Sequence, residues 1–301
     1  MTELLVTGAG GALGSVLMRV LEEQLRTGLG MVSPSGPRPH VGKVFVGDLS
    51  DARTYQDRVL SAAPATIVHA AAISQVAAVY ADPERARTVN VDATARLLSL
   101  ARATGARFVY LSTDLVFDGE SAPYDEDATT EPCSLYGRTK LEAECHVLTY
   151  KRGLVVRLPL LYGEPEVSRA PTFFQSMLAA LREGRPVTLF SDELRTPLWL
   201  DDAARACVQL ALSDVTGVIH AGGPERISRL AMGEQLVRAL GADPALLRPS
   251  LRAEVPAPEP RPRDVSLDSG KFLRQFGAAP GRSFAEALPM LLQHPASRLL
   301  S

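Results

Sequence analysis

The chain has 301 residues, of which 46% are hydrophobic and 22% are charged, and its formal net charge is −2. A chain of this length can bury a large core. Its charge gives no basic surface of the kind that binds nucleic acids or anionic membranes, so small molecules are the expected ligands.

Three cysteines stand at positions 133, 145 and 207, without CxxC spacing, and the five histidines show no ligand spacing. We therefore expect neither a disulfide framework nor a metal site. The N-terminus lacks a basic region followed by a long apolar region, and no uninterrupted apolar stretch approaches the ~20 residues that span a bilayer. These features predict a cytoplasmic protein that does not enter a membrane.

Short β-branched runs alternate with longer helical patterns in the first half of the chain. The expected strands cover residues 4–7, 29–32, 43–46, 66–69, 108–112 and 154–158, and the expected helices cover residues 12–25, 53–62, 83–104 and 134–150. Such alternation is typical of βαβ units, which build a parallel sheet with helices on both faces. We therefore expect a doubly wound α/β fold.

The alternation loosens in the second half. Helices are expected over residues 173–183, 228–240 and 283–292, and strands over residues 186–190 and 218–221. The segment PAPEPRPRD, residues 256–264, has proline at alternate positions and should be extended. We expect residues 1–160, with a returning strand near 216–222, to form the first domain. Residues 161–301 should form a smaller, discontinuous lobe at the carboxyl ends of the strands, where doubly wound sheets bind ligands.

The sequence TGAGGALG, residues 7–14, follows the first strand and opens the first helix. Its glycines allow a tight turn and close backbone approach, while a helix N-terminus presents free N–H groups to a pyrophosphate. The glycine pattern alone is a weak signal, but this context predicts a dinucleotide-binding, Rossmann-type fold. The expected cofactor contacts here are Gly8, Gly10, Gly11, Ala12, Leu13 and Gly14.

The end of the second strand bears on the choice of cofactor. An NAD site usually has a carboxylate there, and no Asp or Glu occurs between Glu23 and Asp48. Ser33, Ser35 and Arg38 could instead accept a 2′-phosphate, which favours NADP, with NAD as the alternative. A solvated loop position explains Arg38 almost equally well.

Other cofactor contacts are expected at strand ends. Asp48, followed by Leu49, can receive the adenine amino group or merely cap the next helix. Small residues after His69 would let the cofactor pass closely, and His69 itself is interpreted as a satisfied strand-end histidine. Asn90 either binds backbone and water near Lys140 or faces solvent. The remaining expected contacts are Ala70, Ala71, Ala72, Ser112 and Leu158.

The sequence SLYGRTKLEAE, residues 134–144, has Tyr136 and Lys140 four apart. On a helix this spacing puts both side chains on one face, about one turn or ~6 Å apart. A nearby cation lowers the pKa of a phenol, which would make Tyr136 a better acid for an alkoxide. About 0.1 such pairs would occur by chance in this chain. Ser112 and Thr113, at the end of a predicted strand, would bring hydroxyl groups to the same edge.

These motifs together resemble the extended short-chain dehydrogenase/reductase superfamily. The similarity is greatest to the dTDP-4-dehydrorhamnose reductase branch, which also includes the β regulatory subunit of methionine adenosyltransferase. The motifs that carry it run in the family's order: TGAGGALG, GDLSD, HAAA, VNVDAT, STDLVFDG, YGRTK, RLPLLYGE, RTPLWLDDAA and RPRDVSLD. The resemblance therefore covers nearly the whole chain.

The resemblance implies a catalytic triad of Thr113, Tyr136 and Lys140. Tyr136 would donate the proton, Thr113 would orient the carbonyl, and Lys140 would hold the nicotinamide ribose and lower the tyrosine pKa. Tyr136 and Lys140 would also contact the cofactor. Hydride would pass to a ketone, usually a 4-keto sugar nucleotide. Dimers formed through two helices per subunit are usual in this superfamily, so a homodimer is possible, although the sequence does not fix the oligomeric state.

The expected substrate contacts include two departures from the reductase pattern. Leu115 and Leu160 stand where the reductases typically have aromatic residues, which suggests a more apolar ketone, such as a secondary-metabolite intermediate. Asp114 is not followed by the second acid of the 4,6-dehydratases, which favours reduction over dehydration. Arg261 and Arg263 could bind a substrate diphosphate or merely solvate the proline-rich segment.

Two classes of function follow. The first is an NAD(P)H-dependent reductase acting on a ketone. The alternative is an NADP-binding regulatory or scaffolding subunit that retains the triad without turnover.

Overall fold

The structure, a computed structural model, describes residues 3–293; residues 1–2 and 294–301, at the ends of the two expected domains, lie outside the described part. Its main sheet is built from β1 (Leu4–Thr7), β2 (Gly28–Val32), β3 (Lys43–Val46), β4 (Thr66–His69), β5 (Arg107–Thr113), β6 (Gly153–Leu158) and β11 (Gly217–His220). The strands are parallel, in the order β11-β6-β5-β4-β1-β2-β3. This confirms the expected doubly wound α/β fold.

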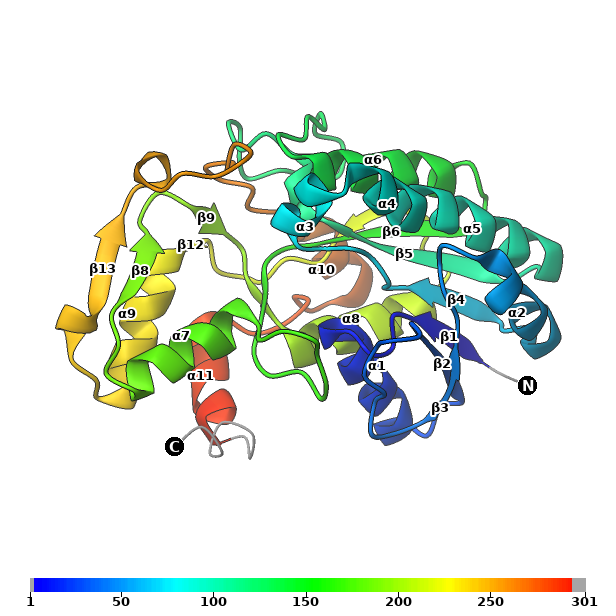
Figure 1. Cartoon of the computed structure of the whole chain (residues 1–301), viewed down its shortest axis with the longest axis horizontal. Helices are drawn as coiled ribbons and strands as arrows, with labels where there is room; N and C mark the ends of the chain where they lie inside the picture. The colour runs from blue at the N-terminus through cyan, green and yellow to red at the C-terminus, as the bar shows by residue number, and fades with distance from the viewer. Residues whose placement is uncertain (1–2, 294–301) are drawn as a thin grey trace.

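Helices cover both faces of this sheet (Figure 1). One face carries α1 (Ala12–Glu23) and α8 (Leu200–Ala211), with α10 (Gly270–Phe276) packed on β11. The other face carries α2 (Gln56–Ala62), α5 (Ala93–Thr104) and α6 (Leu135–Leu148). Each face of the sheet has its own apolar core: the first core lies under α1 and α8, and the second lies under α5 and α6. Side chains alternate along a strand, so Val109 of β5 belongs to the first core and its neighbour Phe108 to the second.

The strand order reverses next to β1. The chain proceeds from β1 to β3 on one side and from β4 to β6 on the other. The carboxyl ends of β1 and β4 are level, since Thr7 pairs with His69. A doubly wound sheet binds ligands outside the carboxyl ends of its strands at such a reversal.

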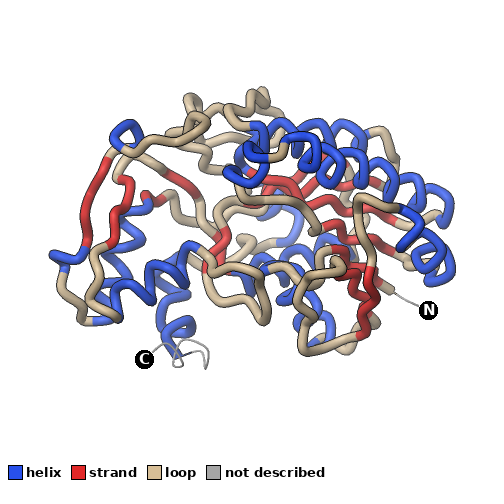
Figure 2. The backbone as a smooth tube through the Cα atoms, viewed as in Figure 1, coloured by secondary structure: helices blue, strands red, loops and turns tan. Residues whose placement is uncertain are grey.

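A third apolar core lies beyond that edge of the sheet. It is formed by α7 (Phe173–Arg182), α9 (Arg229–Leu240) and α11 (Phe284–Gln293). Three short strand pairs accompany these helices: β7 (Leu161–Tyr162) with β10 (Leu198–Trp199), β8 (Val187–Phe190) with β13 (Leu247–Ser250), and β9 (Leu194–Arg195) with β12 (Ile227–Ser228). Figure 2 shows loops joining this part to the sheet. The domain boundary at residue 160 stays a prediction.

Several elements differ from the sequence expectation. The patterns missed α8, α10 and α3 (Val76–Ala81), and the single helix expected over residues 83–104 is divided into α4 (Pro83–Arg87), a π-helical turn (Thr88–Asp92) and α5. Nine of the twelve residues of α8 are buried, and the other three, Asp201, Arg205 and Gln209, are spaced by four, so α8 has a narrow polar stripe with helical spacing that the sequence analysis overlooked. The segment 256–264 contains no helix, as its prolines predict, and its extended conformation stays a prediction.

The turn between β1 and α1 gives a test of the fold. A Cβ atom on Gly14 would lie 2.0 Å from the Gly8 carbonyl oxygen, whereas one on Gly11 would lie 3.2 Å from the same atom. Gly14→Ala should therefore lower the free energy of unfolding by about 1–3 kcal/mol in urea titrations, because the helix must move away from the turn. Gly11→Ala is the matched control and should have a smaller effect; equal effects would contradict this account of the turn.

Candidate active site

A cavity of about 1270 Å³ lies at the carboxyl edge of the sheet. Its walls come from the turn after β1, the ends of β4, β5 and β6, the start of α6, and residues of the second part of the chain. Pockets for a single small molecule usually measure about 300–1,000 Å³. This cavity therefore has room for a dinucleotide together with a second ligand.

Most of the residues expected to form the site line this cavity. They are Gly8, Gly10, Gly11, Ala12, Leu13, Gly14, Ser33, Asp48, Leu49, Ala70, Ala71, Ala72, Ser112, Thr113, Asp114, Leu115, Tyr136, Lys140, Leu158, Leu160 and Arg261. Residues from strand ends and loops far apart in the sequence thus share one space. Their individual roles stay predictions.

Four expected residues do not line the cavity: Ser35, Arg38, Asn90 and Arg263. Arg38 and Arg263 are exposed. Asn90 is buried, so the solvent-facing alternative is wrong; its side-chain amide exchanges hydrogen bonds with the Ile73 backbone (2.8 and 3.1 Å) and donates to Thr139 Oγ1 (3.1 Å). Asn90 therefore connects the segment after β4 to α6.

The helix α6 begins against the sheet edge. Ser134 caps it, since its Oγ accepts a hydrogen bond from the Gly137 N–H (3.1 Å), and Glu259 Oε1 accepts one from the Leu135 N–H (2.7 Å). A Cβ on Gly137 would lie 2.2 Å from the Leu115 carbonyl oxygen. Glycine at this position thus lets the first turn of α6, which carries Tyr136, approach the end of β5.

Lys140 is buried one turn further along α6. Its Nζ donates a hydrogen bond to the Leu111 carbonyl oxygen (2.7 Å) and lies 4.0 Å from the centre of the Tyr110 ring. Burial lowers the pKa of Lys140 from its usual value to about 7, although the nearby Glu144 carboxylate raises it. The lysine therefore loses its charge easily near neutrality.

Tyr136 is also buried, and its burial changes the pKa of the phenol in the direction opposite to the expected one. Burial raises the pKa of the Tyr136 phenol, the negative charge of Asp114 raises it further, and a hydrogen bond with Thr113 lowers it only in part. The lowered phenol pKa implied by the family resemblance is therefore wrong for the protein alone. The physical reason is that removal of a phenolate from water outweighs the other influences here. The phenol stays protonated at neutral pH.

Ser112 and Thr113 are the last two residues of β5, and their hydroxyl groups have different hydrogen-bond partners. Ser112 Oγ donates to Glu144 Oε1, so its hydroxyl is directed to α6. Thr113 Oγ1 accepts from the Leu115 N–H (3.2 Å) and donates to Asp114 Oδ1 (3.1 Å). The Thr113 hydroxyl is thereby held beside Asp114.

Asp114 belongs to a largely buried group of charges that also line the cavity, and the sequence analysis missed the other members, Glu193, Arg195 and Arg229. Arg195 Nε lies 3.5 Å from Asp114 Oδ2, and Arg195 Nη2 lies 3.3 Å from Glu193 Oε1, which also pairs with Arg229 Nε (3.1 Å). Burial raises the pKa of Asp114 to about 6, although Arg195 opposes this shift. Arg195 opens the motif RTPLWLDDAA, so this one residue could have been selected from the sequence.

His69 lies at the end of β4 and is fully buried. Its Nδ1 is hydrogen-bonded to the Thr7 hydroxyl (2.6 Å) and its Nε2 to the Thr94 hydroxyl (3.0 Å). Burial lowers its pKa to about 3, so both ring nitrogens have partners and the ring is neutral, as expected for a satisfied strand-end histidine.

Within residues 3–293 no cluster of His, Cys, Asp or Glu could hold a metal ion. The helices of this same range include none that is long and apolar enough to cross a membrane.

The low pKa of Lys140 predicts how stability depends on pH. Between about pH 7 and the usual lysine pKa near 10.5, the unfolded chain binds a proton that the folded chain has released, so this group makes folding more favourable as pH rises. Lys140→Met should remove that contribution. The difference in unfolding free energy, wild type minus variant, should then be larger at pH 9 than at pH 6 in urea titrations.

The matched control is Lys151→Met, which removes an exposed lysine near the end of the same helix. Its difference from wild type should be the same at both pH values. A constant difference for Lys140→Met as well would mean that the buried lysine keeps its ordinary pKa.

Comparison with known proteins places nearly the whole chain in one family. Residues 1–296 match the family model described as the RmlD substrate binding domain. Methionine adenosyltransferase 2 subunit beta of Xenopus tropicalis is 33% identical over 277 residues, covering 89% of this chain and 80% of that protein. dTDP-4-dehydrorhamnose reductase of Streptomyces griseus is 32% identical over 292 residues, covering 94% of this chain and 91% of that protein.

A solved structure shows the same fold. The dTDP-4-dehydrorhamnose reductase of Bacillus anthracis str. Ames in complex with NADP superimposes with a TM-score of 0.81 at 22% identity, covering 97% of this chain and 99% of that one. Together with the sequence relatives, this likeness confirms the resemblance inferred from the motifs. The chain belongs to the RmlD substrate binding domain family, within the extended short-chain dehydrogenase/reductases.

Proposed function

We propose that this protein is an NAD(P)H-dependent oxidoreductase that reduces a ketone to an alcohol. One observation carries the proposal: Tyr136, Lys140 and Thr113 line the same cavity as the glycine turn after β1. The proposal agrees with a relative named as a reductase and with a structural neighbour in complex with NADP.

The residues of the cavity have the chemistry that such a reaction needs. The turn from Gly8 to Gly14 and the N-terminus of α1 offer backbone N–H groups to a pyrophosphate. NAD(P)H, when bound, supplies the hydride that adds to the carbonyl carbon. Tyr136 gives its phenolic proton to the carbonyl oxygen as negative charge develops there, and Thr113 orients that oxygen by hydrogen bonding. Lys140 holds the nicotinamide ribose.

The raised pKa of Tyr136 suits the direction of reduction. A proton donor has to be protonated before the reaction, and burial keeps the Tyr136 phenol protonated at neutral pH. Lys140, with a pKa of about 7 in the protein alone, gains charge when a hydrogen-bond acceptor or an anion approaches it. A cofactor that accepts hydrogen bonds from Lys140 would favour the charged form of this lysine, and a positive charge there would favour the ionised form of the Tyr136 phenol.

We propose a ketone substrate of the 4-keto sugar nucleotide type, with a secondary-metabolite ketone as the competing class. The first follows from the family; the second follows from Leu115 and Leu160, two apolar side chains that line the cavity where the reductases typically have aromatic residues. Arg261 lines the cavity, but its Nη1 donates to the Val255 carbonyl oxygen (2.6 Å) and its guanidinium lies 5.1 Å from the Phe190 ring centre. A substrate diphosphate would have to compete with those contacts.

The alternative is a cofactor-binding regulatory subunit without turnover. It is supported by the similarity to a methionine adenosyltransferase subunit. We favour the reductase because Thr113, Tyr136 and Lys140 line the same cavity, which a scaffold does not require. A stoichiometric enzyme partner in pull-down experiments, without cofactor oxidation across a ketone panel, would support the alternative. The cytoplasmic location and the homodimer stay predictions.

Tyr136→Phe is the direct test of the proposed acid. Loss of the phenol should reduce cofactor-dependent ketone reduction by about 10²–10⁴-fold while leaving cofactor affinity nearly unchanged, because the ring remains and only the proton donor is lost. The measurement is the loss of NADPH and of NADH absorbance, followed separately, with sugar-nucleotide ketones and non-sugar ketones.

Tyr55→Phe is the matched control, because it removes a buried phenol whose oxygen has no hydrogen-bond partner and which does not line the cavity. It should keep wild-type turnover. Wild-type turnover by Tyr136→Phe would show that another group donates the proton.

A further inference from the structure

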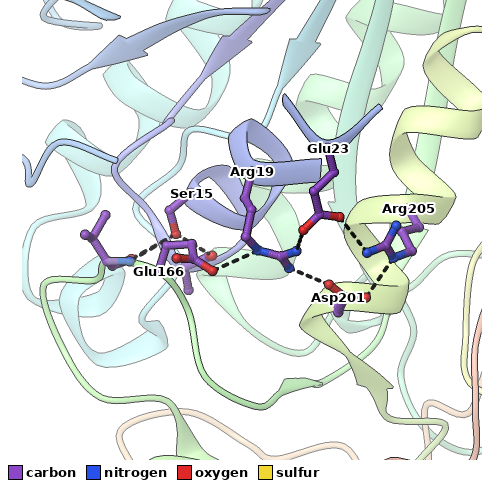
Figure 3. Close-up of polar contacts among 8 residues, drawn as sticks. Ser15, Arg19, Glu23, Glu166, Asp201 and Arg205 are labelled. Carbon is purple, nitrogen blue, oxygen red and sulfur yellow. Dashed lines mark hydrogen bonds and ion pairs between the residues drawn. The ribbon is translucent and has the colours of Figure 1, made fainter. Parts of the chain in front are cut away.

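A segment of the second part of the chain crosses back to the sheet. This crossing segment, residues 163–172, connects β7 to α7. Ser15, in the first turn of α1, donates from Oγ to the Val167 carbonyl oxygen (3.1 Å) and accepts from the Val167 N–H (3.3 Å). Arg19 Nε donates to Glu166 Oε1 (2.8 Å). These contacts hold the crossing segment against α1, as Figure 3 shows.

Further ion pairs fix Arg19 itself. Arg19 also pairs with Glu23 and Asp201, and both of these carboxylates pair with Arg205 (2.8 Å each). Figure 3 shows these four side chains as one network between α1 and α8, joined through Arg19 to Glu166 of the crossing segment. A network of this kind restrains its members more than an isolated surface pair does. The base of the crossing segment is thus held on the sheet side of the cavity.

The tip of the crossing segment carries Arg169. Arg169 Nη2 donates hydrogen bonds to Ser33 Oγ (2.8 Å) and Ser35 Oγ (2.7 Å), and both Ser33 and Arg169 line the cavity. Its partners in the described range are therefore neutral hydroxyls and not a carboxylate. A guanidinium has a planar fork of N–H donors that matches the oxygens of a phosphate.

The position of Arg169, Ser33 and Ser35 in the fold indicates which phosphate group of a dinucleotide they would bind. Ser33 directly follows β2, and the end of the second strand is where a carboxylate holds the adenosine ribose of NAD or an arginine accommodates the 2′-phosphate of NADP. The carboxylate is missing from this stretch of sequence. The same loop lies against the glycine turn, since a Cβ on Gly10 would be 2.1 Å from the Pro37 carbonyl oxygen.

We propose that Arg169, together with Ser33 and Ser35, binds the 2′-phosphate of NADP. Arg169 takes the role that the sequence suggested for Arg38, because Arg169 lines the cavity and Arg38 does not. Because Arg169 belongs to the crossing segment, the phosphate is held by both parts of the chain at once. This inference rests on the proposed function, since it concerns the cofactor of the same site.

Calorimetric titration of the full-length protein with NADP+ and NAD+ tests the proposal. Wild type should bind NADP+ more tightly than NAD+. Arg169→Ala should weaken NADP+ binding by about 10- to 100-fold, the range for a lost charge-assisted hydrogen bond, and change NAD+ affinity less than about twofold. Arg38→Ala is the matched control and should leave both affinities unchanged. Titration with 2′,5′-ADP should repeat the NADP+ pattern without nicotinamide.

Arg169→Lys keeps the charge but not the planar fork, so it should retain part of the NADP+ preference. The inference is overturned if Arg169→Ala weakens both cofactors equally or neither, if Arg38→Ala selectively loses NADP+, or if wild type binds NAD+ alone. In these cases the proposed dinucleotide function still stands. Wild-type protein that binds neither cofactor would contradict the proposed function as well.

Discussion

The carboxylate of Glu144 holds α6 in place on the sheet, and the arrangement of the site depends on it. It accepts a hydrogen bond from Ser112 on β5 and pairs with Arg157 Nη2 on β6 at 2.8 Å. All three residues are buried, so loss of one partner would leave an uncompensated charge or polar group away from water. Tyr136, Lys140 and Glu144 are spaced by four, so fixing Glu144 also fixes the two residues nearer the cavity.

Burial explains both the geometry and the electrostatics of the site. The turn of α6 that carries Tyr136 can approach β5 because Gly137 has no side chain. The same close packing removes water, which lowers the pKa of Lys140 and raises that of Tyr136. In the protein without cofactor, the Tyr136 phenol is therefore protonated, and Lys140, one helical turn away, has a pKa close to neutral pH. A cofactor that supplies acceptor groups to Lys140 would complete the site.

Local sequence patterns predicted much of the fold and the site. The strands from β1 to β6 and the glycine turn follow from β-branched runs and a strand–turn–helix motif, and the Tyr136–Lys140 spacing is a property of one helix. Features that depend on distant contacts were missed. Arg169 meets Ser33 across 136 positions of sequence, so nothing near either residue identifies the pair. The raised pKa of Tyr136 depends on burial by several elements, which spacing cannot reveal.

A double-mutant cycle on Glu144 and Arg157 tests most directly whether this buried pair fixes α6. The unfolding free energies of wild type, Glu144→Gln, Arg157→Met and the double variant would be measured in urea. We predict that each single change is strongly destabilising, by about 3–5 kcal/mol, and that the two residues are coupled by about 1–3 kcal/mol. Small single effects that add without coupling would contradict the account.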